Sequence, residues 1–203
     1  MLKRLTVKGR MNIINISILA LFVTMVTFSV WNSNGVKEMG IEKTGEVMLA
    51  DQKARIQLAS HAAALMAEAA LAGVTDEAEV KPTVRRLVDK VIYEADRSGY
   101  YFIYEGTTAV AFPVAKDKVG KDLGGVTDKN GVKVIQALRD KARAGGGFVQ
   151  YIWPNPGAGD QPKLSYAEMI PGSSMWIGTG VYLDNIEAYQ NQMAAEIGSM
   201  VSK

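Results

Sequence analysis

The sequence predicts an α+β domain in which a five-stranded antiparallel sheet packs against a long N-terminal helix, with one transmembrane helix ahead of it. Three observations lead to this prediction. An uncharged apolar run lies near the N-terminus, an alanine-rich stretch with helical spacing follows it, and five β-favouring segments occupy the second half of the chain. At 203 residues the chain has room for one core-forming domain and an additional segment.

The composition excludes several classes of function. Cysteine is absent and His61 is the single histidine, so disulfide frameworks, thiolate metal sites and two-histidine metal sites cannot form within one chain. We therefore expect no metal, no cofactor and no enzyme active site. The formal net charge of +2 is spread along the chain without a run of like charges, which argues against a nucleic-acid partner.

Residues 11–31 read MNIINISILALFVTMVTFSVW and contain no charged side chain. A helix of this length, at about 1.5 Å per residue, spans the roughly 30 Å hydrocarbon layer of a bilayer. Four basic residues lie ahead of it: Lys3, Arg4, Lys8 and Arg10. The positive-inside rule then predicts that residues 1–10 form a cytoplasmic tail and that the chain after residue 31 is extracytoplasmic.

A cleaved signal peptide is the alternative interpretation of the same run. The apolar stretch is longer than a typical signal core, and no Ala-x-Ala-like site of small residues follows Ser29. These two features favour an uncleaved anchor.

Two helical patterns follow the anchor. From about Gly35 to Gly73, good helix formers dominate and apolar residues recur in helical spacing, so we expect a long helix whose upper part packs on the domain. The spaced positions are Val47, Ala50, Ala54, Leu58 and Leu65. A second helix is expected after Pro82, a suitable residue for a first helical turn, and should end by Ser98 and Gly99.

Five segments favour β-strands: 100–104, 109–112, 148–153, 164–169 and 175–182. A helix over residues 132–144 is expected between the second and third strands, after a turn and helix cap at Asp128 to Gly131. Two strands, a helix and three antiparallel strands, with a long helix against one face, make an α+β domain of the PAS-like type. Residues 184–203 are amphipathic and predict a last helix that returns toward the membrane.

Seven short motifs follow one another between residues 99 and 184. They are GYYFIY (99–104), FP (112–113), VGKDL (119–123), DKNG (128–131), GFVQYIW (147–153), KLSY (163–166) and WIGTGVYLD (176–184). In this order and spacing they resemble the single Cache sensory domain of methyl-accepting chemotaxis proteins. One departure is Phe112, because many relatives show a histidine before the proline, so the cavity here should be more apolar.

The resemblance implies a bacterial inner-membrane protein whose extracytoplasmic sensory domain covers residues 32–186. Such a domain binds a small metabolite, often an organic acid, and passes a displacement through helices, here residues 187–203, to a cytoplasmic signalling domain that this chain does not contain. A homodimer is expected from the stalk helices. Similar domains occur on histidine kinases and cyclic-nucleotide enzymes, so the output stays open, and a freestanding membrane-anchored adaptor is a further alternative.

A candidate ligand site follows from side-chain parity, because alternate residues of a strand share a face. A buried carboxylate ligand needs a cation and hydrogen-bond donors. We expect Lys163 to supply the charge, Tyr151 a hydroxyl and Trp153 an apolar wall. The full candidate set is Tyr100, Phe102, Tyr104, Phe112, Tyr151, Trp153, Lys163 and Ser165. The alternative interpretation is that the aromatic residues are core, Lys163 is solvated, and His61 is a packing residue.

Overall fold

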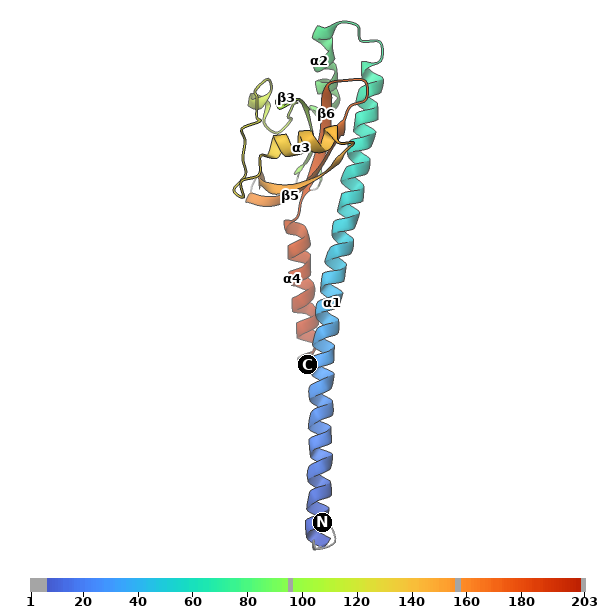
Figure 1. The fold of residues 1–203 in the computed structure, drawn as a ribbon, viewed down its shortest axis with the longest axis vertical. Coiled ribbons are helices and arrows are strands. Elements are labelled where there is room, and N and C mark those ends of the chain that lie inside the picture. Colours follow the sequence, from blue (N-terminus) through green and yellow to red (C-terminus); the bar gives the residue numbers. More distant parts are fainter. Residues whose placement is uncertain (1–6, 95–96, 156–157, 202–203) are drawn as a thin grey trace. The chain divides into compact units, whose positions relative to one another are not determined.

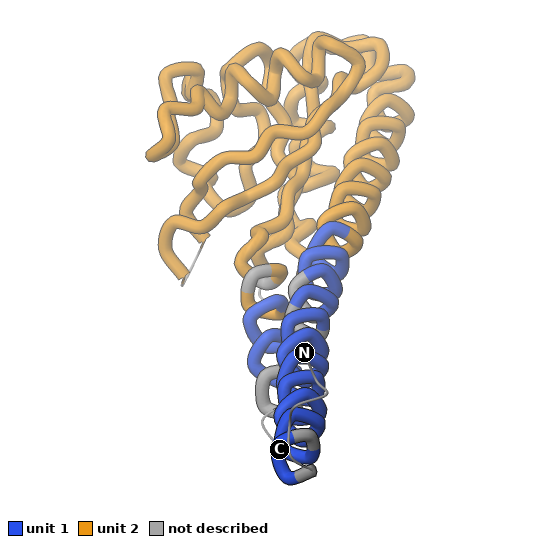
Figure 2. Tube along the Cα trace, turned by 60° about the horizontal axis from the view of Figure 1, so that its bottom comes forward, with its two compact units in different colours: residues 1–46, 190–203 blue, residues 47–189 orange. Residues whose placement is uncertain are grey.

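The computed structural model describes residues 7–94, 97–155 and 158–201, and the chain divides into two units (Figure 2). We call residues 47–189 the sheet unit, and residues 1–46 with 190–203 the stem unit. The elements in chain order are α1 (Val7–Leu71), α2 (Glu77–Val88), β1 (Ile92–Tyr93), β2 (Gly99–Glu105), β3 (Thr108–Ala111), η2 (Lys116–Lys118), α3 (Val134–Arg143), β4 (Gly147–Asn155), β5 (Gly159–Met169), β6 (Met175–Tyr182) and α4 (Asp184–Val201) (Figure 1).

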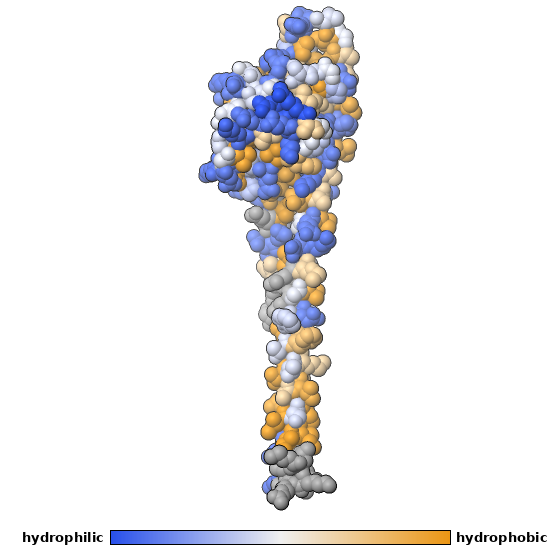
Figure 3. All heavy atoms as spheres, in the orientation of Figure 1, coloured by the Kyte–Doolittle hydropathy of each residue, from blue (hydrophilic) through white to orange (hydrophobic). Residues whose placement is uncertain are grey.

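The stem unit contains the candidate membrane span, Met11–Asn32. Its large apolar side chains are exposed, and they gather along the lower part of the space-filling view (Figure 3). Exposure of this kind suits a helix surrounded by lipid, since nothing in the described chain covers it. In the same unit, the Gln190 side-chain amide of α4 lies 3.5 Å from the Ile41 carbonyl of α1.

α1 is a single helix, whereas the sequence predicted a membrane helix that ends at residue 31 and a separate helix from about Gly35. No proline stands between the two patterns, and the glycines there only weaken a helix, by about 1 kcal/mol each relative to alanine. Turn-favouring residues such as Asn32 were therefore too weak a signal to end the helix.

α2 begins earlier and ends earlier than predicted. Asp76 caps it by accepting a hydrogen bond from the Ala78 backbone N–H at 2.9 Å, so Pro82 lies inside the helix and not in its first turn. The helix ends at Val88, and Ile92–Tyr93 form the short strand β1, which pairs with Tyr100 and Gly99. The five predicted strands are thus joined by a sixth, whose Ile92 also continues the helical spacing of Val84, Leu87, Val88 and Val91.

The described strands form one antiparallel sheet in the order β1-β2-β6-β5-β4, and β3 pairs with β2. The register places Tyr104 opposite Trp176, Lys163 opposite Tyr182, and Tyr151 opposite Lys163. Since paired residues share a face, these side chains all lie on one side of the sheet.

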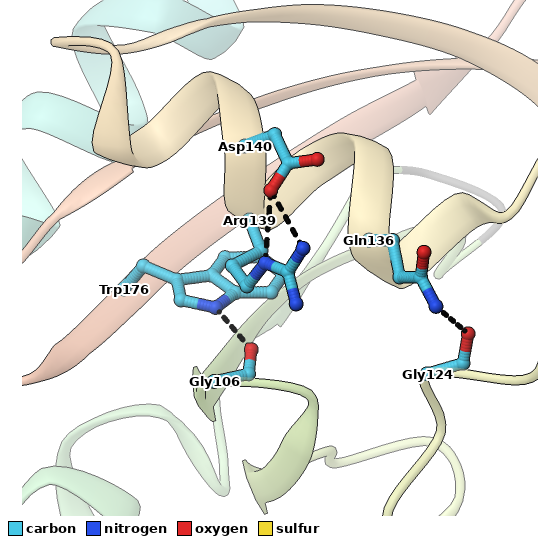
Figure 4. Close-up of polar contacts among 6 residues, drawn as sticks. All are labelled: Gly106, Gly124, Gln136, Arg139, Asp140 and Trp176. Carbon is cyan, nitrogen blue, oxygen red and sulfur yellow. Dashed lines mark hydrogen bonds and ion pairs between the residues drawn. The ribbon is translucent and has the colours of Figure 1, made fainter.

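The two faces of the sheet carry different partners. Residues of α1 pack on one face with Ile103 and Ile177, while α3 packs on the other through Val134, Ile135 and Leu138. Trp176 and α3 are also tied to the loops: the Trp176 indole N–H donates to the Gly106 carbonyl, and the Gln136 amide donates to the Gly124 carbonyl, both at 2.8 Å (Figure 4).

The face of α1 that packs on the sheet is not the one whose apolar spacing the sequence singled out. The buried positions are Ile56, Ser60, Ala63, Ala64 and Ala67. Val47, Leu58 and Leu65 are 60 %, 70 % and 45 % exposed. Because the helix is rich in alanine, two stripes along it are apolar, and spacing alone does not tell which of them packs on the sheet.

Gly178 on β6 provides a test of this packing. A Cβ atom there would lie 2.5 Å from the Tyr166 carbonyl oxygen and 2.6 Å from the Phe102 ring. We expect Gly178→Ala to lower the free energy of unfolding by about 1–3 kcal/mol, because backbone and a packed ring must both move. Denaturant titration of both forms measures the difference.

Gly125→Ala is the matched control, because nothing lies within 4 Å of its Cβ position. Its free energy of unfolding should stay within about 0.5 kcal/mol of the parent. Equal losses for the two variants would contradict the described packing of β2, β5 and β6.

Candidate functional site

An aromatic wall covers the sheet face beneath α3. Tyr100, Phe102 and Tyr104 of β2 are buried there, with successive ring centroids 6.4 and 6.1 Å apart. Phe112, which follows β3, lies 5.8 Å from the Tyr100 ring and 6.4 Å from the Tyr104 ring. The shared face expected from parity is therefore present.

Trp176 completes this wall, and the sequence analysis missed it. Its ring stacks on Tyr104 at 4.9 Å and 13°. The signal was available, because Trp176 and Tyr182 have the same parity on β6, separated only by Gly178 and Gly180. Gly178 leaves room for the Phe102 ring, and Gly180 leaves room for the Ser165 side chain.

Lys163 of β5 is buried on this same face, 1 % exposed. Its ammonium nitrogen lies 4.1 Å from the centre of the Tyr100 ring and 4.4 Å from that of Tyr182. Among the described residues its Nζ atom has no hydrogen-bond partner. The structure confirms that the Lys163 side chain is buried inside the domain. The alternative, a solvated lysine at the edge of the sheet, is wrong.

Burial lowers the pKa of the Lys163 amine from 10.5 to about 7. The two tyrosine faces offset part of the cost, since a cation is attracted to an aromatic ring, but rings do not replace hydrogen bonds to an ammonium. A shift of this size corresponds to a free-energy cost on the order of 5 kcal/mol. The amine is therefore a buried group on β5 whose charge the chain compensates only in part.

The polar atoms of Tyr151, Ser165 and Trp153 already have partners other than Lys163. The Tyr151 hydroxyl lies 2.8 Å from the Ser165 Oγ, so the two expected donors bind each other. The Trp153 indole N–H donates to the Tyr100 hydroxyl, whose pKa burial raises well above its usual value. The Tyr182 hydroxyl donates to the Pro154 carbonyl at 2.6 Å.

Two hollows lie against the wall. The larger is a cavity of about 480 Å³, and Tyr100, Phe112 and Trp153 line it together with loop residues. The smaller, of about 10 Å³, is lined by all six predicted aromatic residues and by α3. Lys163 and Ser165 line neither hollow, but Tyr100, whose ring contacts the lysine nitrogen, lines both.

The loop side of the larger cavity was not predicted. Its further lining residues are Val114, Ala115, Lys118, Val126, Thr127, Asp128, Lys129, Ile152, Pro154, Asn155 and Asp160. Most lie in the connection from β3 to α3 or at the turn end of β4 and β5, where the sequence shows no periodicity that would place a side chain.

Asp128 fixes this loop to the sheet. Its carboxylate accepts hydrogen bonds from the backbone N–H groups of Asn130, Val132 and Ile152 at 2.8 to 2.9 Å. Desolvation would raise the pKa of this carboxyl, but the three bonds together lower it. The expected turn is present, whereas the expected helix cap is wrong, because Lys133 occupies the N-cap position of α3 without a side-chain bond.

His61 lies outside the cavity. It is on α1, where its Nδ1 is 3.0 Å from the Glu168 carboxylate of β5. Its side chain is 59 % exposed. It binds the helix to the opposite face of the sheet, which agrees with its interpretation as a packing residue.

An antiparallel sheet with a long helix on one face and a loop-bounded cavity on the other is a PAS-like architecture, and the family match shows which class of PAS-like domain it is: a sensory Cache domain, a ligand-binding and non-catalytic kind of domain. The chain belongs to the Single Cache domain 2 family, which matches residues 44–196.

Relatives and solved structures agree with this assignment. The chain is 32 % identical over 186 residues to the sensor histidine kinase MctS of Rhizobium johnstonii, which covers 88 % of this chain and 40 % of that protein. It is 31 % identical over 96 residues to the methyl-accepting chemotaxis protein McpP of Pseudomonas putida, covering 46 % of this chain and 18 % of that protein. The chain thus spans less than half the length of either.

A solved methyl-accepting chemotaxis protein from Vibrio parahaemolyticus has the same fold. It is 26 % identical, with a TM-score of 0.61, and the match covers 72 % of this chain and 98 % of the solved one. With one apolar N-terminal helix, these matches support a membrane protein with an extracytoplasmic sensory domain.

The buried amine predicts how stability depends on pH. The folded pKa of Lys163 lies below its unfolded value, so between pH 10.5 and pH 7 the unfolded chain binds a proton that the folded chain does not. Its contribution to stability therefore rises with pH across this window, by about 1.4 kcal/mol per pH unit. The Lys163→Met variant should lack this rise, and near pH 7 its free energy of unfolding should exceed that of the parent chain.

Denaturant titrations of the parent and of Lys163→Met from pH 6 to pH 10 test this expectation. Lys121→Met, which changes an exposed lysine, should keep the parental slope. A parent and a Lys163→Met variant with parallel pH profiles would show that the amine is not buried as described.

Proposed function

We propose that this chain is the ligand-sensing portion of a transmembrane bacterial receptor and that the ligand is a short organic acid. The observation that carries the proposal is the Lys163 amine, 1 % exposed and without a hydrogen-bond partner in the described chain. A carboxylate is the group that best compensates such a cation, because a charge-assisted hydrogen bond replaces the lost hydration.

The arrangement of the cavity supports the same ligand class. The larger cavity begins at Tyr100, whose ring covers the lysine nitrogen, and aromatic side chains supply the walls. Displacement of the Tyr100 ring, which the Trp153 indole holds by one hydrogen bond, would open a path from the cavity to the amine. Tyr100, Phe112 and Trp153 line both hollows, so the larger cavity and the smaller hollow adjoin at these three side chains.

Tyr182 offers a route from the ligand to the exit helix. It contacts Lys163, it is the last residue of β6, and α4 begins at Asp184. A ligand that binds the Lys163 ammonium changes the contact between this ammonium and the Tyr182 ring. The ligand thereby favours one arrangement of the junction between β6 and α4. Ligand binding can shift such an equilibrium only through its different affinity for the two arrangements.

The output is proposed to be a cytoplasmic signalling domain, as in the named relatives, which include a histidine kinase and chemotaxis proteins. The anchor Met11–Asn32 would place the sheet unit outside the inner membrane and the N-terminus in the cytoplasm.

Short carboxylates should stabilise the chain. In detergent, the thermal unfolding midpoint of the full chain should rise with at least one of acetate, propionate, lactate, pyruvate or succinate. A ligand that binds only the folded state at 100 times its Kd adds about 2.7 kcal/mol. Lys163→Met should abolish the rise, whereas Lys121→Met should leave it unchanged. No shift with any of these acids would exclude the acid-ligand proposal.

The affinity for that carboxylate should fall above neutral pH. The free amine has a pKa of about 7, and the bound form must be charged, so each binding event at higher pH takes up a proton. We expect the Kd to increase about tenfold per pH unit above pH 7, until the pKa of the bound amine is reached. Calorimetric titrations at pH 8.5 in two buffers of different ionisation enthalpy measure the proton uptake.

A Kd that is equal at pH 6.5 and pH 8.5 would contradict this coupling. It would still allow carboxylate binding at another cation of the cavity, such as Lys118.

A further inference from the structure

A second cavity of about 480 Å³ lies in the sheet unit, away from the aromatic wall. The end of α1, the first turns of α2, the end of β2 and the turn before β6 supply its lining. We call it the α2 cavity. It shares no lining residue with the larger cavity or the smaller hollow beside Tyr100. Its volume lies in the range of small-molecule sites, which is about 300–1,000 Å³.

One part of the lining of the α2 cavity is apolar. Met175 belongs to the buried cluster that α1 and α2 form with the sheet, and Leu71 and Val80 pack against the same cluster. Val74, which follows α1, adds a fourth apolar side chain. A bound molecule can therefore remove an aliphatic group from water here.

The charged part of the lining consists of two glutamates and one lysine, so its net charge is −1. The Lys81 ammonium lies 2.7 Å from the Glu105 carboxylate, and the Ser174 hydroxyl donates to the same carboxylate at 2.5 Å. These two donors lower the pKa of the Glu105 carboxyl, which is therefore ionised at neutral pH. Among the described residues, Glu77 forms no ion pair.

The hydroxyl groups of the lining are already used as donors. The Ser174 proton is directed at Glu105, and the Ser173 hydroxyl donates to the Ile170 carbonyl at 3.0 Å. A carboxylate offers about four acceptor positions, so both glutamates of the lining keep free acceptor capacity. An occupant is thus favoured if it donates hydrogen bonds.

The start of α2 does not provide an anion site in this cavity. Asp76 caps the helix: its carboxylate accepts from the Ala78 backbone N–H at 2.9 Å, and its carbonyl accepts from the Glu79 N–H at 3.0 Å. The cap already supplies a negative charge where a helix N-terminus attracts one. A second anion would be repelled by it and by the two glutamates.

We propose that the α2 cavity binds a small organic cation, a short primary alkylammonium. Its ammonium group donates to the carboxylates of Glu105 and Glu77, and its alkyl chain is buried against Leu71, Val80 and Met175. A primary ammonium has three N–H donors, which suits a site with two carboxylates.

Lys81 is the group that the ligand displaces. Its side chain is 50 % exposed, and that of Glu105 is 39 % exposed, so Lys81 can turn to solvent and leave the carboxylate to the ligand. An ion pair with this exposure changes an equilibrium constant by at most about fivefold. The alkyl chain compensates for this loss, because each buried methylene lowers the Kd by up to about fourfold.

Isothermal titration of the full chain in a non-ionic detergent with n-pentylammonium chloride at pH 7.5 tests the proposal. We expect saturable binding of one molecule per chain, with a Kd that falls from butyl- to pentyl- to hexylammonium. Lys163→Met should leave the Kd unchanged. This variant separates the cation site from the proposed acid site, since the two proposals can fail independently.

Three substitutions in the lining should act with different signs. Glu105→Gln should raise the Kd about fivefold or more and Glu77→Gln about twofold or more, because each removes a charged acceptor. Lys81→Met should lower the Kd by up to about fivefold, because it removes the competing cation. Glu79→Gln is the matched control: Glu79 is on the same helix and pairs with Arg86, but does not line the cavity.

The thermal unfolding midpoint of each variant checks that the fold is intact. Absence of saturable pentylammonium binding to the parent chain would overturn the proposal. A Kd that both Glu105→Gln and Glu77→Gln leave at the parental value would overturn it too. So would weaker binding to Lys81→Met, because a site that needs this lysine takes an anion or a zwitterion.

Discussion

The sheet unit is organised around one buried amine. Lys163 sits between the rings of Tyr100 and Tyr182, and no described group accepts a hydrogen bond from it. Almost every other polar atom near it is paired: Tyr151 with Ser165, Tyr182 with Pro154, and Trp153 with Tyr100. The buried amine is thus the point in this region where a bound group could supply a missing hydrogen-bond acceptor.

Strand parity predicted the aromatic face of this site well, because the side-chain period of a strand is fixed by its geometry. Tyr100, Phe102 and Tyr104 were assigned to one face, and Lys163 to the same side as Tyr151, without any knowledge of the sheet order. The sequence could not say that Tyr151 and Ser165 bind each other, since that depends on the register between β4 and β5. It also could not locate the loop wall around Asp128, because irregular segments have no period to read.

Helix patterns were harder to interpret than strands, and the reason is alanine. Along α1, the stripe of Leu58 and Leu65 and the stripe of Ile56 and Ala63 are both apolar, so spacing alone does not tell which one meets the sheet. The structure shows that the sheet buries Ile56, Ala63 and Ala67 and leaves Leu58 and Leu65 exposed. At α2 the opposite ambiguity occurred: Ile92 continued the helical spacing, yet pairing with Tyr100 made it part of β1.

The energetics of the amine match the demands of a switch. Whether Lys163 is neutral or charged near pH 7, holding it in the resting fold costs on the order of 5 kcal/mol relative to a solvated ammonium. To move a two-state equilibrium from 1:99 to 99:1, a ligand needs a differential affinity of about 5.5 kcal/mol. An anion that restores the lost interactions of the amine in only one arrangement has access to a free energy of this order. Under the proposed function, this cost is the free energy on which a ligand could draw to change the junction between β6 and α4.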